Sequence, residues 1–327
     1  MKSLSIALGC LMLAPAATAQ TPVLNVLTYD GFAAEWGPGP AIEAGFEATC
    51  ACDLRWVMAG DGAAMLARLR LEGATSEADV VLGLDTSLTE AARQTGLFAP
   101  HGLRLPNDLP VPFDDAHFVP FDWGWFAFVH NKTMANPPTS FEDLAASDLR
   151  ILIQDPRSST PGLGLVLWVK AAYGDRAGEI WSALADNIVT VTPGWTEAYG
   201  MFLQGEADMV LSYTTSPAYH LIADADDSKT AAAFTEGHYL QVEVAGMLAA
   251  SDQPDLARAF LRHLASEEAQ AVLPTTNWMY PALTPAAGLP EGFDSLMRPG
   301  KSLLMTAAAA EAARTEAIAE WQAALAR

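Results

Sequence analysis

The sequence predicts an α/β protein built of two lobes. Short apolar runs typical of buried strands alternate with helical patterns, without internal repeats or low-complexity segments. The chain has 327 residues, a length typical of about two domains. Two of the predicted strands pass between the lobes, which implies a hinge with a ligand cleft beside it.

The first lobe begins with strands and helices in alternation, a pattern typical of a parallel sheet. We expect strands over residues 23–29, 54–58 and 79–84 and helices over 40–46 and 63–71. The second helix follows Asp61, a residue suited to cap it.

The aromatic apolar run 121–129 predicts a strand that leaves the first lobe, and 242–249 predicts one that crosses back. Further helices are expected over residues 162–172, 196–202, 256–264, 267–272 and 306–327. The crossings divide the chain into lobe 1, residues 20–120 plus 246–284, and lobe 2, residues 121–245 plus 285–327.

The N-terminal residues 1–19 have the parts of a cleavable signal peptide. Lys2 precedes an apolar run over residues 4–14, and small residues, Ala17-Thr18-Ala19, precede Gln20. We therefore expect export. No later apolar stretch reaches the roughly 18 uncharged residues that a membrane helix needs.

The net charge of −21 becomes −22 when Lys2 is removed with the signal peptide. This charge argues against nucleic acid and anionic membrane surfaces as partners, and it favours a cationic small molecule.

Two segments predict a strand that runs directly into a helix. In the segment 211–220, Ser216 suits the N-cap and Pro217 the first helical position. In the segment 154–162, Thr160 is the expected N-cap before Pro161. Hydroxyls and free backbone amides at such turns can bind an anion such as phosphate, although a capped helix without a ligand is the simpler interpretation of either turn alone.

Several aromatic residues fall in predicted turns rather than on apolar helix faces: Trp36, Trp195, Tyr213, Tyr219, Trp278 and Tyr280. Converging rings would suit a flat cationic heteroaromatic ligand. The apolar surroundings of the other tryptophans considered, Trp56, Trp168, Trp181 and Trp321, predict core positions instead.

These segments resemble the periplasmic thiamine-binding proteins of bacterial ABC importers. The resemblance covers almost the whole mature chain, and it includes the segments 28–30, 35–40, 60–62, 78–85, 154–164, 194–200, 211–220, 236–244 and 277–281. It implies a type II periplasmic solute-binding fold and a monomeric receptor without a cofactor or catalytic residues. The implied ligands are thiamine, thiamine monophosphate and thiamine pyrophosphate, and the implied partners are an ABC permease and its ATPase.

The ligand-binding residues expected from the turns, the aromatic residues and the resemblance come from both lobes. They are Tyr29, Trp36, Asp61, Gly62, Ser159, Thr160, Trp195, Tyr213, Thr214, Thr215, Ser216, Pro217, Tyr219 and Trp278.

Two other functions are less consistent with the sequence: a solute-binding protein of the same fold for another ligand such as ferric ion, and a secreted hydrolase. A ferric site would need adjacent tyrosines, but Thr214 and Thr215 separate Tyr213 from Tyr219. A secreted hydrolase would use Ser159 or Ser216 as a nucleophile, but no histidine pairing is indicated. Cys50 and Cys52 can form a disulfide after export, and they lack the partner ligands of a zinc site.

Overall fold

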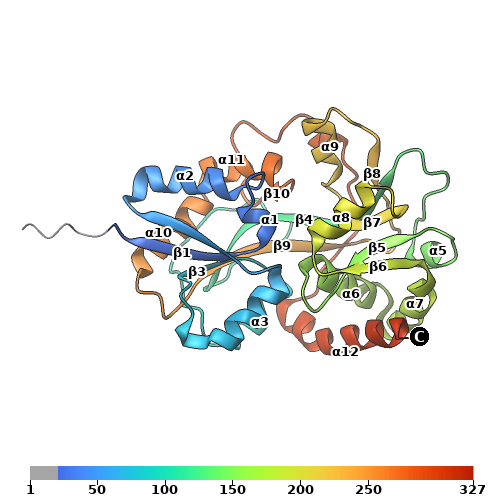
Figure 1. Cartoon of the computed structure of the whole chain (residues 1–327), viewed down its shortest axis with the longest axis horizontal. Coiled ribbons are helices and arrows are strands. Elements are labelled where there is room, and N and C mark those ends of the chain that lie inside the picture. Colours follow the sequence, from blue (N-terminus) through green and yellow to red (C-terminus); the bar gives the residue numbers. More distant parts are fainter. Residues whose placement is uncertain (1–20, 327) are drawn as a thin grey trace, which may run out of the picture.

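A mixed sheet passes through both lobes of the computed structural model, which describes residues 21–326 (Figure 1). The predicted signal peptide therefore lies outside the described residues. Within those residues, no helix is long and apolar enough to span a membrane.

Three parallel strands begin the first lobe: β1 (Val23–Thr28), β2 (Asp53–Met58) and β3 (Val80–Asp85). The helices between and after them are α1 (Asp30–Ala33), α2 (Gly39–Cys50), α3 (Gly62–Glu72) and α4 (Thr89–Arg93), with a 3-10 turn, η1 (Gly73–Thr75). Two later helices, α10 (Pro254–Leu264) and α11 (Glu267–Thr276), pack against α2. The strands and helices expected here are confirmed, with ends that differ by a few residues.

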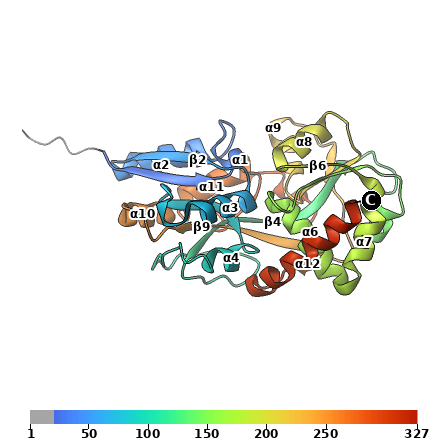
Figure 2. The same ribbon diagram turned by 60° about the horizontal axis from the view of Figure 1, so that its bottom comes forward.

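The second lobe has its own parallel strands, β5 (Ile151–Gln154) with β6 (Ile188–Thr192) and β7 (Met209–Tyr213). Its helices are α5 (Phe141–Ala145), α6 (Thr160–Tyr173), α7 (Ala177–Leu184), α8 (Trp195–Leu203), α9 (Pro217–Ala223) and α12 (Ala307–Leu325). Figure 2 shows α6, α7 and α12 together on one side of this lobe, where α12 packs against both other helices. Short elements complete the chain: η2 (Gly174–Arg176), η3 (Ala185–Asn187), β8 (Lys229–Ala231), β10 (Tyr280–Pro281), η4 (Phe293–Ser295) and β11 (Ser302–Leu303).

Two long strands connect the lobes, β4 (Phe118–Asn131) and β9 (His238–Met247). They pair antiparallel with each other, while β9 also pairs antiparallel with β3 and β4 with β7. The two predicted crossings are thus confirmed. The parallel pattern expected for the first lobe is confirmed for β1, β2 and β3, whereas the connecting strands pair antiparallel with each other, with β3 and with β7.

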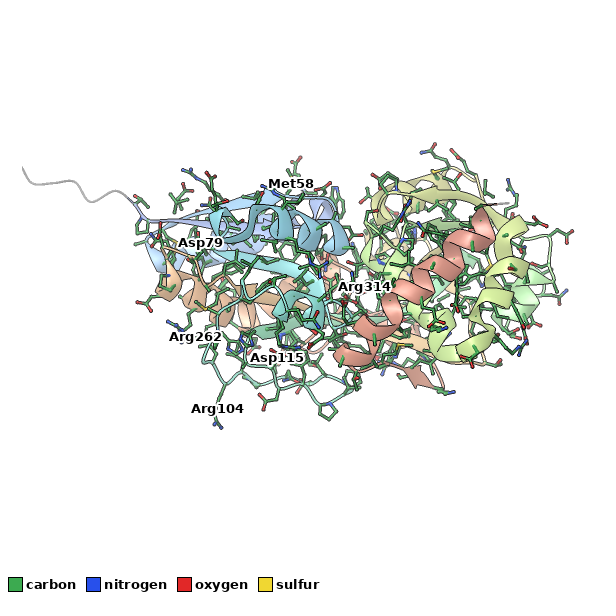
Figure 3. The ribbon with its side chains drawn as sticks, turned by 90° about the horizontal axis from the view of Figure 1, so that it is seen from below. Met58, Asp79, Arg104, Asp115, Arg262 and Arg314 are labelled. Carbon is green, nitrogen blue, oxygen red and sulfur yellow. A yellow bond between two sulfur atoms is a disulfide. The ribbon has the colours of Figure 1, made fainter. Side chains whose placement is uncertain are left out.

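Most predicted core tryptophans are buried. Trp168 and Trp181 are inaccessible and Trp321 is 4% exposed, whereas Trp56 is half-buried with its ring edge against Phe32. The side-chain view in Figure 3 places Met58, Asp79, Arg104, Asp115 and Arg262 in the first lobe, and Arg314 on α12. In each lobe, helices pack on that lobe's part of the sheet, for example α3 on β3 and α8 on β7.

A disulfide joins Cys50 to Cys52 just after α2, with Cα atoms 5.2 Å apart. This separation lies within the ordinary range for the bond. Ala51 between them has a positive φ of 52° and ends the helix. The pairing that the sequence left open is therefore present in the structure.

Candidate ligand-binding site

The two lobes meet where the beginnings of α3 and α6 face each other. Asp61 caps α3, because its Oδ1 accepts a hydrogen bond from the backbone N–H of Gly62 at 2.9 Å. Its other oxygen, Oδ2, accepts a hydrogen bond from the Ser159 hydroxyl at 2.8 Å. Gly62 also donates to Thr160 Oγ1 at 3.2 Å. The structure thus brings together four predicted site residues that are about a hundred positions apart in the chain.

The predicted cap position is wrong by one residue for α6 and is confirmed for α9. Ser159, not Thr160, precedes α6, and its hydroxyl bonds to Asp61 instead of the helix backbone. Ser216 precedes α9, and Pro217 is the first helical residue, as predicted. However, the Ser216 hydroxyl accepts from the Tyr213 N–H at 3.1 Å and pairs with Ser212, so it closes the turn rather than capping the helix.

Four aromatic rings form two groups at the lobe boundary. A Cβ atom at Gly31 would lie 3.3 Å from the Trp36 ring and 3.8 Å from the Tyr29 ring, so both rings flank this glycine. Trp36 is 55% exposed, an unusual value for such a large apolar side chain. Across the boundary, the Tyr219 and Trp278 rings meet edge to face with centroids 5.4 Å apart.

Of the other predicted site residues, Trp195 and Thr215 have side-chain partners among the described residues, whereas the buried Thr214 hydroxyl has none. The Trp195 indole N–H donates to Ser212 at 2.7 Å, and its ring stacks on Tyr199. Thr214 and Thr215 are fully buried, and Thr215 Oγ1 lies 3.7 Å from the Met279 sulfur, next to Trp278. The end of β7 is therefore packed against the Trp278 segment.

A buried polar network at the lobe boundary escaped the sequence analysis. The Tyr29 hydroxyl donates to Glu243 Oε2 at 3.0 Å, and Asn277 donates to Asp122 at 2.6 Å and to the Tyr29 oxygen at 2.9 Å. Gln241 donates to Glu243 at 2.7 Å. A signal was present, since Asp122 and Glu243 interrupt apolar strand sequences.

The carboxyl groups of this region resist ionisation. Burial raises the pKa of Asp85 to about 7 and that of Asp122 to about 8. Burial and the nearby Asp122 carboxyl raise the pKa of Glu243 well above its ordinary value. For Asp61, burial raises the pKa, and hydrogen bonds from Ser159, Gly62 and Thr160 oppose this shift.

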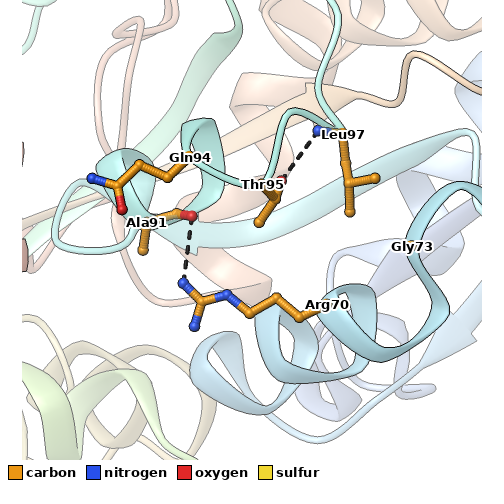
Figure 4. A pocket seen from close by; sticks show the side chains of 6 residues that line it. All are labelled: Arg70, Gly73, Ala91, Gln94, Thr95 and Leu97. Carbon is orange, nitrogen blue, oxygen red and sulfur yellow. Dashed lines mark hydrogen bonds between the residues drawn. The ribbon is translucent and has the colours of Figure 1, made fainter.

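The region is not arranged as a metal centre. Within residues 21–326, no cluster of three or more His, Cys, Asp or Glu residues could hold a metal ion. A hollow of about 270 Å³ lies elsewhere, between α3 and α4, and contains none of the predicted site residues (Figure 4). Its lining residues are Arg70, Gly73, Ala91, Gln94, Thr95 and Leu97.

Two α/β lobes, two connecting strands and polar side chains meeting between the lobes define a type II solute-binding fold. The chain belongs to the bacterial extracellular solute-binding protein family, whose model matches residues 34–271. The periplasmic location expected from the sequence is confirmed by this membership and by the relatives' names.

Comparison with known proteins gives more specific similarities. The thiamine-binding periplasmic protein of Escherichia coli (strain K12) is 52% identical over 324 residues, covering 98% of each chain. A solved periplasmic thiamin binding protein has a TM-score of 0.92 and 51% identity, covering 97% of this chain and 100% of that one. A ferric binding protein from Campylobacter jejuni has a TM-score of 0.76 at 18% identity, covering 92% and 99% of the two chains, which shows the fold alone.

Proposed function

We propose that this chain is the periplasmic receptor for thiamine and its phosphate esters, and that it delivers them to an ABC permease and its ATPase. The relatives that are about half identical over nearly the full length carry thiamine binding in their names. The observation that carries the proposal is the meeting of aromatic rings and buried carboxyl groups at the lobe boundary.

The aromatic groups suit the two flat rings of thiamine. Tyr29 and Trp36 lie on the first lobe, and Tyr219 lies on the second, against Trp278 in the segment after α11. Stacking and cation–π attraction act on a fixed positive charge that accepts no hydrogen bond. No Lys, Arg or His of the described residues pairs with Asp122 or Glu243, so these carboxyl groups are available to a cationic ligand.

The phosphate of an ester would lie near the beginnings of α6 and α9. Ser159 and Thr160 begin the first of these helices, and Thr215 and Ser216 precede the second. Free amides and hydroxyls at a helix start favour anions. The Asp61 carboxyl group accepts hydrogen bonds from Gly62 and Ser159 at this place, so an ester phosphate would compete with it for these donors.

The lobes are proposed to move as the sequence analysis divides them, with residues 20–120 plus 246–284 in one lobe and 121–245 plus 285–327 in the other. The packing of α10 and α11 against α2 and of α12 against α6 and α7 supports this division. Ligand binding would favour the closed arrangement by its higher affinity for that state.

We propose a receptor rather than a hydrolase. The Ser159 hydroxyl bonds to Asp61, and the Ser216 hydroxyl bonds to Ser212, so neither is paired with an imidazole. Nucleophilic serines need such a base.

Calorimetric titration with thiamine, thiamine monophosphate and thiamine pyrophosphate tests the receptor function. We expect saturable binding of one ligand per chain, with ferric citrate as a negative control. Prolonged incubation with thiamine monophosphate should release no inorganic phosphate. Absence of binding for all three thiamine forms would refute the proposal.

A further inference from the structure

Asp122 and Glu243 lie opposite each other on the two strands that connect the lobes. Asp122 is inaccessible to solvent, and Glu243 is 6% exposed. Tyr29 and Asn277 link them, because Tyr29 donates to Glu243, and Asn277 donates to both Tyr29 and Asp122. This carboxyl pair therefore contacts Tyr29, an expected ligand-binding residue, and it neighbours Trp278 through Asn277.

Among residues 21–326, the neighbouring ionisable groups that act on Glu243 are all acids. Asp61 at the start of α3 and Asp85 at the end of β3 raise the pKa of Glu243 by charge repulsion. Tyr29 follows β1, and the Glu243 and Asp122 carboxyl groups raise the pKa of its hydroxyl. The same two groups, together with Asp61 and Asp85, raise the pKa of Tyr213 at the end of β7. Burying two ionised carboxylates without a neighbouring cation would cost much free energy. The pair Asp122 and Glu243 therefore retains a proton when no cation is bound.

Two buried oxygen atoms next to the carboxyl pair have no hydrogen-bond partner. The Gln241 amide nitrogen is bound to Glu243, but its carbonyl oxygen has no hydrogen-bond partner although the side chain is fully buried. Asp122 Oδ1 is likewise unpartnered. Native proteins satisfy nearly all buried polar atoms, so these two oxygens are free to accept a hydrogen bond or a positive charge from a ligand group.

We propose that Asp122 and Glu243 determine specificity for a positively charged ligand, and that the pair gives up a proton to solvent when the cation binds. The inference rests on the proposed thiamine function. The O–H bond of one carboxylic acid breaks, its proton passes to the buffer, and the ligand's positive charge takes its place. The net charge of the site is unchanged by the exchange.

This exchange makes affinity depend on pH in a defined direction. The pKa of Asp122 is raised to about 8 by burial, and a nearby cation lowers it by favouring the carboxylate. Below the pKa of the ligand-free pair, binding must displace the proton. Thiamine affinity should therefore rise by about tenfold per pH unit as the pH approaches that value, and then level off.

Titration calorimetry of the full mature chain with thiamine measures the proton directly. Parallel titrations at about pH 7 use phosphate and Tris, buffers with different enthalpies of ionisation. We expect release of about one proton per thiamine. An isostere of thiamine with carbon in place of the charged thiazolium nitrogen should bind without release. Since it keeps the same pyrimidine, proton changes on that ring cancel in the comparison.

Asp122→Asn removes the titrating group and should abolish most of the proton release and flatten the pH profile. Asp79→Asn is the matched control, because Asp79 is a buried carboxyl in the first lobe bound to Asn25 and Ser251. It should leave proton release unchanged. If Asp122→Asn does not fold, Glu243→Gln and the buffer series on the unaltered chain serve the same purpose.

The outcomes separate the two proposals. Binding with equal heats in both buffers and an affinity constant across pH would overturn the proton exchange and leave the receptor function intact. No binding of thiamine or its esters would overturn the receptor function itself.

Discussion

The Ser159 hydroxyl lies 2.8 Å from Oδ2 of Asp61, and this hydrogen bond joins the beginnings of two helices on different lobes. The backbone N–H of Ala64 reinforces the contact by donating to the Ser158 carbonyl at 3.1 Å. The contact holds the lobes together at the edge of the candidate site.

Gly62→Ala should weaken ligand binding by interfering with lobe closure. The added Cβ would lie 2.3 Å from Thr160 Oγ1, far inside normal contact distance. We expect at least about a tenfold loss of thiamine affinity, or about 1.4 kcal/mol, and a larger radius of gyration by small-angle X-ray scattering with ligand present.

Gly200→Ala on α8 is the control for Gly62→Ala, because its Cβ would meet nothing within 4 Å. It should bind thiamine normally. Unchanged affinity of Gly62→Ala, with a melting temperature close to that of the unaltered chain, would contradict the role of this contact.

Trp36→Ala and Trp278→Ala should each weaken thiamine binding by about 1 to 3 kcal/mol, through lost stacking and burial. Trp36 is more than half exposed without ligand, so its replacement should hardly change the melting temperature. Leu71→Ala provides a control at an exposed apolar residue, 89% accessible, on the outer part of α3. Calorimetry that finds no loss for either tryptophan variant would rule out the aromatic site.

Replacing Ser159 and Thr160 together by alanine should weaken thiamine monophosphate clearly and free thiamine less, because charge-assisted hydrogen bonds to phosphate are the stronger ones. Since neither side chain caps α6, the change in stability should come from the lost contacts to Asp61 and Gly62, about 1 kcal/mol each. Ser158→Ala, next to them and bonded to the Pro193 carbonyl, is the control. Equal losses for both ligands would assign the two hydroxyls to structure alone.

The contribution of Asp122 to the free energy of unfolding should fall as the pH rises from about 4 to about 8. Its pKa in the folded state, about 8, is above the value in the unfolded chain, so the folded state holds the extra proton across this window. The stability contributed by that proton is complete below the unfolded pKa and is lost as the pH passes through the folded one.

Urea denaturation at a series of pH values measures this effect. The side chain in Asp122→Asn stays neutral, so the free energy of unfolding of this variant should fall less as the pH rises. At alkaline pH, the variant should be more stable than the unaltered chain. A parallel pH profile for the two proteins would show that Asp122 is ionised in the ligand-free fold.

The sequence by itself determined the α/β class, the two crossings, the approximate positions of the long helices and of the strands of the first lobe, and the family. These follow from local patterns of consecutive residues, namely apolar runs, turn residues and segments such as residues 211–220. Pro217 at the first position of α9 was predictable for this reason, since its fixed φ and missing N–H depend only on its own position.

The tertiary structure alone decided the partners of polar groups. Thr160 had the local qualities of an N-cap, but Ser159 precedes α6, and its hydroxyl donates to Asp61, 98 residues earlier in the chain. Asp122 and Glu243 became a pair because β4 and β9 run antiparallel with these two residues opposite each other, next to a register shift at Pro120, and their raised pKa values follow from shared burial. Burial and charge repulsion depend on distances between segments that are far apart in the chain, and the sequence order does not contain those distances.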